Sequence, residues 1–153
     1  MAIKTQHSMQ FLLEQHQKEH NTISDTLIIV LVEHPFEFNP HTHSTYGDIS
    51  ALELPTLGGY IQKDKVLSYL NYAIDVQSDD LIIKYSDAEW IGEAGCGDLP
   101  LVGGAVIINA SHINDTIVLG ITLSNAYQFV EGQPLGFGFG QGLVISRANE
   151  LEG

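Results

Sequence analysis

Cysteine and positive charge are both scarce in this sequence. Cys96 is the only cysteine among 153 residues, so the chain cannot form an internal disulfide and its fold needs no oxidising compartment. Six Lys and Arg residues stand against 19 Asp and Glu residues, which gives a formal net charge of −13 with neutral histidines. Such a surface has few cations to displace counterions from phosphates, and anionic membranes repel it. We therefore expect a protein or a cation as partner, rather than nucleic acid or a membrane, unless the acidity serves only solubility.

Long apolar runs are also missing. No stretch approaches the roughly 18–20 apolar residues that a membrane-spanning helix needs. The opening residues 1–10 (MAIKTQHSMQ) are too polar for a signal peptide. A length of 153 residues suits one domain, and a hydrophobic content of 44% is enough for a core without disulfides. The 15 glycines, together with many β-branched and aromatic residues, indicate a mostly β chain.

The first 20 residues carry the clearest helix pattern. Ser8 is a suitable N-cap, and Asn21 is a plausible stop. A helix over residues 8–20 would place four side chains on one apolar face, namely Met9, Leu12, Leu13 and His16. We expect residues 1–20 to form an N-terminal helical arm, followed by a single β-sandwich domain over residues 21–153.

The remaining chain predicts short strands joined by turns. Residues 26–32 (TLIIVLV) form a run short enough for a buried strand, and residues 34–50, with two prolines, indicate a long loop. Further strands are predicted on either side of a glycine-rich loop over residues 94–104, at residues 72–76, 81–85, 88–91, 105–109, 117–123, 135–139 and 143–146. A spacing of about 8–12 residues is typical of sandwiches and barrels. The predicted fold class is mostly β, an antiparallel, jelly-roll-like β-sandwich with a short N-terminal helix.

Two histidines in the long loop could ligate a metal ion. His41 and His43 lie on one side of an extended segment, Asp48 follows five residues later, and His112 could add a third imidazole. Neutral imidazoles bind Zn²⁺ and similar ions, and an H-x-H pair begins the first metal motif of cupin-type jelly rolls. The glutamate that follows the pair in cupins has no counterpart here at that spacing. We prefer a solvated loop without metal, and keep a cupin-like metal-dependent enzyme using these four residues as the alternative.

No other pattern predicts catalysis or a cofactor. Residues 136–142 (GFGFGQG) place glycine at every second position, whereas a dinucleotide-binding loop needs a different spacing and a following helix. Such a strand would have one face without side chains, which is typical either of the close approach of another chain or of a bent strand. Cys96 has no basic neighbour to favour its thiolate. We therefore assign no catalytic residue and no cofactor, and expect a binding protein rather than an enzyme.

Four short motifs follow one another between Asn21 and Ser146. They are ISDTLIIVLVE at residues 23–33, GGY at 58–60, DAEW at 87–90 and GQPLGF at 132–137. Their order resembles small acidic virion proteins of tailed bacteriophages, of the capsid decoration or cement kind, in which D-T-I-x-V-x-L, G-G-Y, D-x-x-W and G-x-P-L-x-F recur. The histidine-rich loop at 34–43 and the glycines at 136–142 depart from that pattern.

This resemblance implies a virion structural protein on the outer capsid surface. It would bind the major capsid protein and stabilise the shell as a homo-oligomer, a dimer or a trimer, after synthesis in the host cytoplasm. A protein outside the shell need not touch packaged DNA, which agrees with the negative charge. We expect residues 1–20 and 34–50 to make the contacts, and a tail or fibre component of the virion is the remaining alternative.

Overall fold

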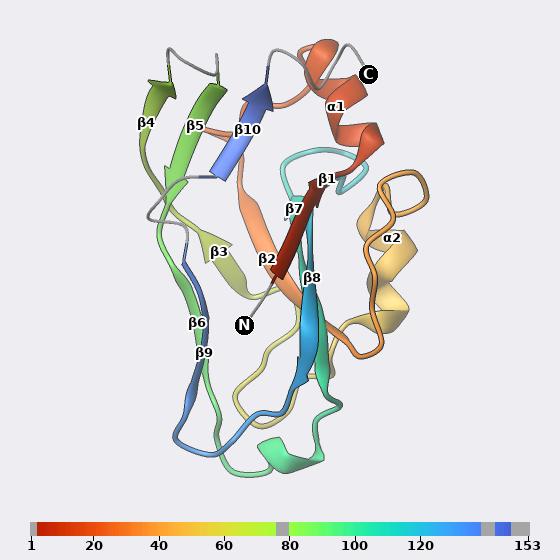
Figure 1. Cartoon of the computed structure of the whole chain (residues 1–153), viewed down its shortest axis with the longest axis vertical. Helices are drawn as coiled ribbons and strands as arrows, with labels where there is room; N and C mark the ends of the chain where they lie inside the picture. The colour runs from red at the N-terminus through yellow and green to blue at the C-terminus, as the bar shows by residue number, and fades with distance from the viewer. Residues whose placement is uncertain (1–2, 76–79, 139–142, 148–153) are drawn as a thin grey trace.

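The computed structural model is built mainly of antiparallel strands and describes residues 3–75, 80–138 and 143–147 (Figure 1). Two short helices, α1 (Met9–His16) and α2 (Tyr46–Ile49), and two single-turn 3-10 helices, Ser50–Leu52 and Cys96–Asp98, lie between the strands. The strands in chain order are β1 (Ile3–His7), β2 (Leu27–Glu33), β3 (Lys65–Leu67), β4 (Tyr69–Asp75), β5 (Asp80–Tyr85), β6 (Ala88–Ile91), β7 (Val102–Asn109), β8 (Ile117–Tyr127), β9 (Pro134–Phe137) and β10 (Leu143–Arg147).

Five strands form the first layer of the molecule. Their order across the sheet is β1-β8-β7-β2-β3, and every neighbouring pair is antiparallel. β2 is buried from Leu27 to Val32 and β7 along its whole length, so both faces of these strands are covered. A strand covered on both faces has a continuous apolar sequence rather than an alternating one. The strand predicted at residues 26–32 is therefore confirmed, with its ends shifted by one residue.

The second layer consists of two smaller sheets that follow one another. β5 pairs with both β4 and β10, and β6 pairs with β9, all antiparallel. Only Ser86 and Asp87 separate β5 from β6, and the two sheets continue along the same side of the molecule (Figure 1). The two layers confirm the prediction of a mostly β, antiparallel, sandwich-like fold.

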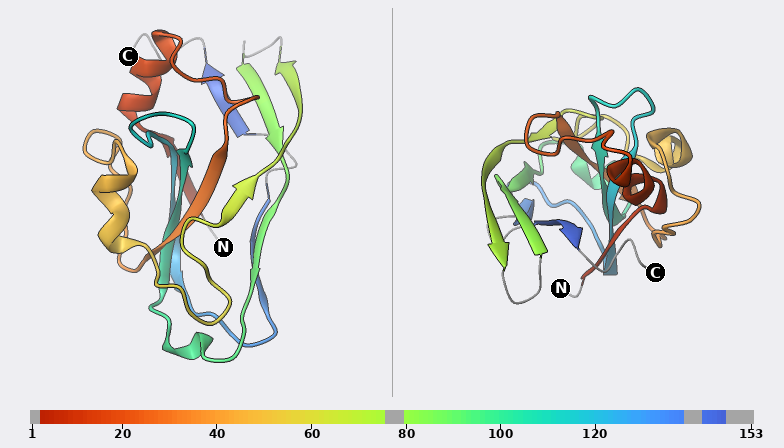
Figure 2. Two further views of the ribbon diagram at one scale, coloured as in Figure 1. Left: turned by 180° about the vertical axis from the view of Figure 1, so that it is seen from behind. Right: turned by 90° about the horizontal axis from the view of Figure 1, so that it is seen from above.

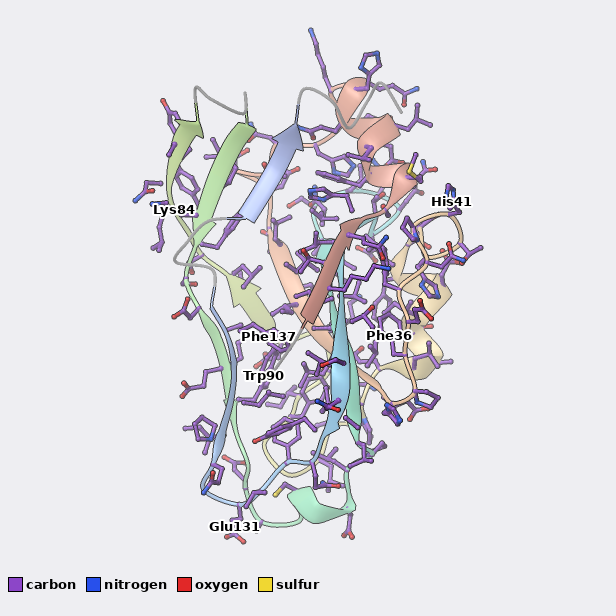
Figure 3. The ribbon with its side chains drawn as sticks, viewed as in Figure 1. Phe36, His41, Lys84, Trp90, Glu131 and Phe137 are labelled. Atoms are coloured by element: carbon purple, nitrogen blue, oxygen red, sulfur yellow. The ribbon has the colours of Figure 1, made fainter. Side chains whose placement is uncertain are left out.

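The main core fills the space between these layers. Leu27, Ile29 and Leu31 enter it from β2, and Trp90 and Phe137 enter it from β6 and β9 (Figure 3). The Trp90 and Phe137 rings pack edge to face, with their centroids 6.2 Å apart. The tryptophan of the Asp-Ala-Glu-Trp motif is thus a core residue, and burial of so large a ring stabilises the packing of the two layers.

The long loop covers the other face of the five-stranded sheet. Alternate residues of β2 face this side and pack in a second core with loop side chains, the cluster comprising Ile28, Val30, Val32, Phe36, Phe38, Ile49, Val106, Ile108 and Ile117. α2, which lies in this loop, is on the side of the sheet away from β4 and β5 (Figure 2). The segment expected to be a solvated contact loop is thus in part a third packed layer.

The first 20 residues differ from the expected helical arm. β1 pairs with β8 from Ile3 opposite Leu123 to His7 opposite Leu119, so the segment is part of the sheet. Ser8 is the N-cap as predicted and accepts a hydrogen bond from the Phe11 N–H, but the helix ends at His16 instead of continuing to His20. Of the predicted apolar face only Leu12 packs, partly buried, against the core; Met9, Leu13 and His16 are exposed, and the buried helix residues are Phe11 and Glu14.

One further expectation has a different outcome, and another falls partly outside the described residues. The loop predicted at residues 94–104 ends earlier, because Val102, Gly103 and Gly104 belong to β7. Gly104 sits where an added Cβ would lie 2.3 Å from the carbonyl oxygen of Ile121 and 2.7 Å from the ring of Phe36. Glycine in this strand therefore allows close packing. In the sequence alone, the same glycines indicate a loop. Residues 139–142 of the glycine-rich segment lie outside the described residues.

Candidate functional site

Two of the three loop residues predicted as metal ligands, His43 and Asp48, make side-chain contacts that shape the loop. His43 Nδ1 accepts a hydrogen bond from the Asn39 N–H at 2.9 Å, and its ring stacks on Phe36 with a centroid distance of 5.6 Å. The Asp48 carboxylate accepts the N–H groups of Thr45 and Ser44 at 2.9 and 3.0 Å, and these bonds lower its pKa. His41 is exposed at the outer side of the loop (Figure 3).

The fourth predicted ligand, His112, lies in a different group. Within the described residues, its Nε2 shares a cluster with Glu14 Oε1 and His20 Nε2, in which all three atoms lie within 4.8 Å of one another. No group of that compactness joins His112 to the loop residues His41, His43 and Asp48 in the same part of the chain. The structure therefore separates the four residues that the cupin-like alternative required to be together.

Glu14 is the centre of this second group. Its Oε1 accepts hydrogen bonds from His20 Nε2 at 2.9 Å and from the Thr116 hydroxyl at 2.7 Å, while Oε2 accepts one from Gln10 at 2.7 Å. His112 Nε2 is 3.7 Å from the same Oε1. Burial alone would raise the pKa of Glu14, but the hydrogen bonds from Gln10, Thr116 and His20 outweigh it, and the pKa lies below its ordinary value.

The end of α1 and the β7–β8 turn bring these residues together. Lys18 adopts a left-handed conformation with φ 64°, and the Glu19 N–H donates to the Glu14 carbonyl at 2.9 Å, so the chain turns back after the helix. This reversal places His20 against Glu14. His112 comes from the turn after β7, where its N–H donates to the Asn109 carbonyl at 3.2 Å. The His20 and His112 rings stack with centroids 4.7 Å apart.

A hydrogen-bond partner on the other ring nitrogen fixes the orientation of each imidazole. The Asn109 side-chain amide donates to His20 Nδ1 at 2.9 Å and to Asp25 at 2.8 Å. The Asn114 N–H is 3.2 Å from His112 Nδ1, and the Thr116 hydroxyl oxygen is also 3.2 Å from it. Sequence reasoning missed this group because Glu14 stands on the expected polar face of the helix, and Thr116 and His112 are about a hundred residues away.

A second buried carboxylate, Glu53, joins the loop to the first layer. It accepts the hydroxyls of Tyr46 and Tyr60, and the Lys63 N–H at 3.0 Å. The Tyr60 oxygen in turn accepts the N–H of Leu31 in β2 at 3.0 Å. Every member of this network has a partner within the fold, so its role is to hold the segment 46–63 against β2.

An exposed apolar margin is the other candidate site. β3 is the last strand of the five-stranded sheet and β4 the last of the three-stranded sheet, and the chain passes from one to the other at Ser68. We call residues 65–75 the β3–β4 edge. Val66, Leu70 and Tyr72 on it are 51%, 55% and 57% exposed. Leu70 has no partner in β5, because the register shifts between Tyr69 and Asn71.

The β3–β4 edge has the properties of a surface for another chain. β4 is at the outer margin of the molecule (Figure 1). A strand at a sheet margin has backbone N–H and C=O groups directed away from its one neighbour, and another strand can pair with them. Exposed apolar side chains beside such groups add affinity for a protein partner.

Comparisons with known proteins provide no relative for this chain. No protein-family model, no curated protein and no solved structure matches it. In the part of the chain that the structure describes, no helix has both the length and the apolar character to span a membrane. Functional inference therefore rests on the chain's own clusters and surfaces.

Proposed function

We propose that this chain is a structural protein of a tailed-phage virion, a decoration protein that binds the major capsid protein on the outside of the shell. The observation that carries the proposal is the β3–β4 edge, where Val66, Leu70 and Tyr72 are more than half exposed on margin strands. The resemblance of the ordered motifs to decoration proteins supports the same function. Strand addition to this edge would supply main-chain hydrogen bonds, and the three side chains would supply apolar contacts.

Charge indicates the chemistry of the partner surface. The chain carries −13 at neutral pH, so a basic surface of the capsid protein is favoured, and a nearby patch of acidic residues is disfavoured. The same charge opposes association of two copies through their acidic faces. A dimer or trimer on the shell would therefore bury apolar residues at its own contacts, and symmetry of the shell would set the number of copies.

The test is binding to empty shells assembled from the major capsid protein of the phage that would encode this chain. We expect the wild-type chain to co-sediment with the shells, and the double variant Leu70→Lys with Tyr72→Lys to lose most of its occupancy. Lysines on a margin strand obstruct strand pairing, and they would also repel a basic partner. Substitutions at exposed positions of this kind usually change the free energy of unfolding by less than about 0.5 kcal/mol.

Ile113→Lys is the matched control. Ile113 lies in the β7–β8 turn, far along the chain from the edge, and is 93% exposed. Its replacement removes the same kind of apolar surface and adds one positive charge, where the double variant adds two, so each single edge variant is compared with it as well. Equal loss of occupancy in the control and in the edge variant would exclude the β3–β4 edge as the contact. If the wild-type chain bound purified tails but not shells, the proposed function would change from a decoration protein to a tail component.

A further inference from the structure

Two glutamates and two histidines converge where the end of α1 meets the β7–β8 turn. Glu14 Oε1 is 2.9 Å from His20 Nε2 and 3.7 Å from His112 Nε2, and His112 Nε2 is 3.3 Å from Glu19 Oε1. Ligand atoms at about 2.0–2.1 Å from a tetrahedral zinc ion lie about 3.3 Å from each other. Glu14, His20 and His112 thus already lie within 4.8 Å of one another, near the spacing of a coordination sphere, and Glu19 approaches from the His112 side.

We propose that Glu14, Glu19, His20 and His112 bind one divalent transition-metal ion of the zinc class. Imidazole nitrogen with carboxylate oxygen suits Zn²⁺, Co²⁺ and Ni²⁺, whereas Ca²⁺ and Mg²⁺ prefer sites made of oxygen alone. The site is independent of the capsid-binding function and does not involve the β3–β4 edge. It would join the N-terminal helix to the turn between the two longest strands of the first layer.

Most of the ligands are already held in position. Gln10 and Thr116 fix the Glu14 carboxylate from two sides, and the side chains of Glu14 and His112 are 4% and 7% exposed. Glu19 is more mobile in principle, since its side chain is 42% exposed, and it gives the ion a path from solvent. Such an arrangement lowers the conformational entropy cost of binding, because Glu19 is the one ligand side chain that is substantially exposed.

The protons on the two imidazoles determine how the ion enters. A ligating Nε2 needs its proton on Nδ1, and a neighbouring acceptor stabilises that form. In the ion-free chain, His112 Nδ1 accepts the Asn114 N–H at 3.2 Å and His20 Nδ1 faces the Asn109 amide nitrogen at 2.9 Å, so each ring carries its proton on Nε2, toward Glu19 and Glu14 respectively. The ion must displace both protons. The Thr116 oxygen, whose own hydrogen goes to Glu14, lies 3.2 Å from His112 Nδ1 and can accept the relocated proton once Asn114 shifts, and the Asn109 amide must turn to accept the proton on His20 Nδ1.

The experiment uses the full chain without an affinity tag, with Zn²⁺ alone as the probe and Mg²⁺ as the comparison ion. We expect one equivalent of Zn²⁺ to bind and to raise the melting temperature, with no rise in Mg²⁺. Co²⁺ should give the intense visible absorption of a four-coordinate site. A long-range ¹H–¹⁵N spectrum should show the His112 and His20 protons on Nδ1 after Zn²⁺ is added.

Three variants locate the ion. Glu19→Gln and His112→Gln are expected to raise the Kd for Zn²⁺ by about tenfold or more. His43→Gln, which removes a histidine of the alternative loop site, should leave the Kd unchanged. If His112→Gln does not fold, the exposed Glu19→Gln decides alone. Absence of one-to-one binding, an equal response to Mg²⁺, or an equal loss in His43→Gln would each overturn the proposal, while shell binding would remain a separate question.

Discussion

Two glycines show how closely single positions are fitted. An added Cβ at Gly120 in β8 would lie 2.0 Å from the ring of Phe38. At Gly136 in β9 the nearest atom would be 3.5 Å away. We expect Gly120→Ala to lower the free energy of unfolding by about 1–3 kcal/mol through overpacking, and Gly136→Ala to change it little. Urea denaturation of both variants measures this, and equal losses would contradict it.

The Tyr60 hydroxyl is a second position where one atom matters. It donates to the buried Glu53 and accepts from the Leu31 N–H, so Tyr60→Phe leaves a buried donor and a buried carboxylate each without one partner. We expect a loss of about 1–3 kcal/mol in the free energy of unfolding. Tyr72→Phe is the control, because Tyr72 is 57% exposed and should be nearly neutral. Thermal unfolding and urea unfolding should both show Tyr60→Phe to be less stable than Tyr72→Phe.

Site residues were less predictable from the sequence than core residues. The His41-Thr42-His43 pattern suggests metal ligands. In the structure the His43 ring instead stacks on Phe36 and accepts the Asn39 N–H. The Asp48 carboxylate accepts the N–H groups of Ser44 and Thr45. Glu14 and His20 belong to the chain reversal after α1, and their partners come from the β7–β8 turn. Contacts over about a hundred residues leave no local pattern, which is why only His112 of this group was singled out from the sequence.

At the scale of elements, burial on one or both faces explains which strands could be predicted. β2 and β8 were found because apolar runs and period-two alternation are local signals, and the structure confirms both. The helix was predicted, but its buried face was not. Contacts with β8 and the β7–β8 turn determine that Phe11 and Glu14 are the buried residues. Pairing of β1 with β8 depends on a residue separation of more than a hundred and could not be inferred from the sequence.

β1 yields a prediction about the N-terminal segment. Deleting residues 1–7 removes the strand that covers one margin of β8 while it keeps Ser8 and α1. At about 0.5–1.5 kcal/mol for each backbone hydrogen bond lost, we expect the free energy of unfolding to fall on the order of 3 kcal/mol. Urea titration measures the fall, and an unchanged midpoint would show that β1 is dispensable. A change in shell occupancy in this variant would have to be corrected for the folded fraction.

For the whole molecule, stability should decline at both ends of the pH scale. The pKa values of Glu14 and Asp48 lie below their ordinary values, so the stability they supply is present above about pH 4.5 and is lost as the pH falls through the lowered values. Burial raises the pKa of Tyr85 to about 12, and raises those of Tyr46 and Tyr60 with help from Glu53. Stability from these hydroxyls is present below about pH 10 and lost above it.

Melting temperatures from pH 3 to pH 12 check this profile. We expect a broad maximum between roughly pH 5 and pH 9, with losses on both sides. The Asp48→Asn variant should lose part of the acid limb, and Tyr85→Phe part of the alkaline limb. A profile that is flat above pH 10 would mean that the three buried hydroxyls ionise as readily in the folded chain as in the unfolded one.

The net charge of −13 should affect folding and the proposed capsid binding in opposite directions when salt is added. Raising the ionic strength from about 10 mM to about 150 mM shortens the screening length from about 30 Å to about 8 Å. Repulsion among the acidic residues of the free chain then weakens, so we expect its melting temperature to rise, by about 3 °C for 1 kcal/mol. Attraction to a basic shell weakens as well, so occupancy should fall over the same range.

Calorimetry and co-sedimentation in the same salt series measure the two effects. The double variant Asp64→Asn with Glu131→Gln, in which both exposed residues lose their charge, should show a smaller response in both experiments. Glu131 lies at the end of the molecule opposite to α1, so its charge acts through the overall field and not through the histidine cluster (Figure 3). If occupancy instead rose with salt, apolar contacts at the β3–β4 edge would dominate, and the partner surface would not be basic.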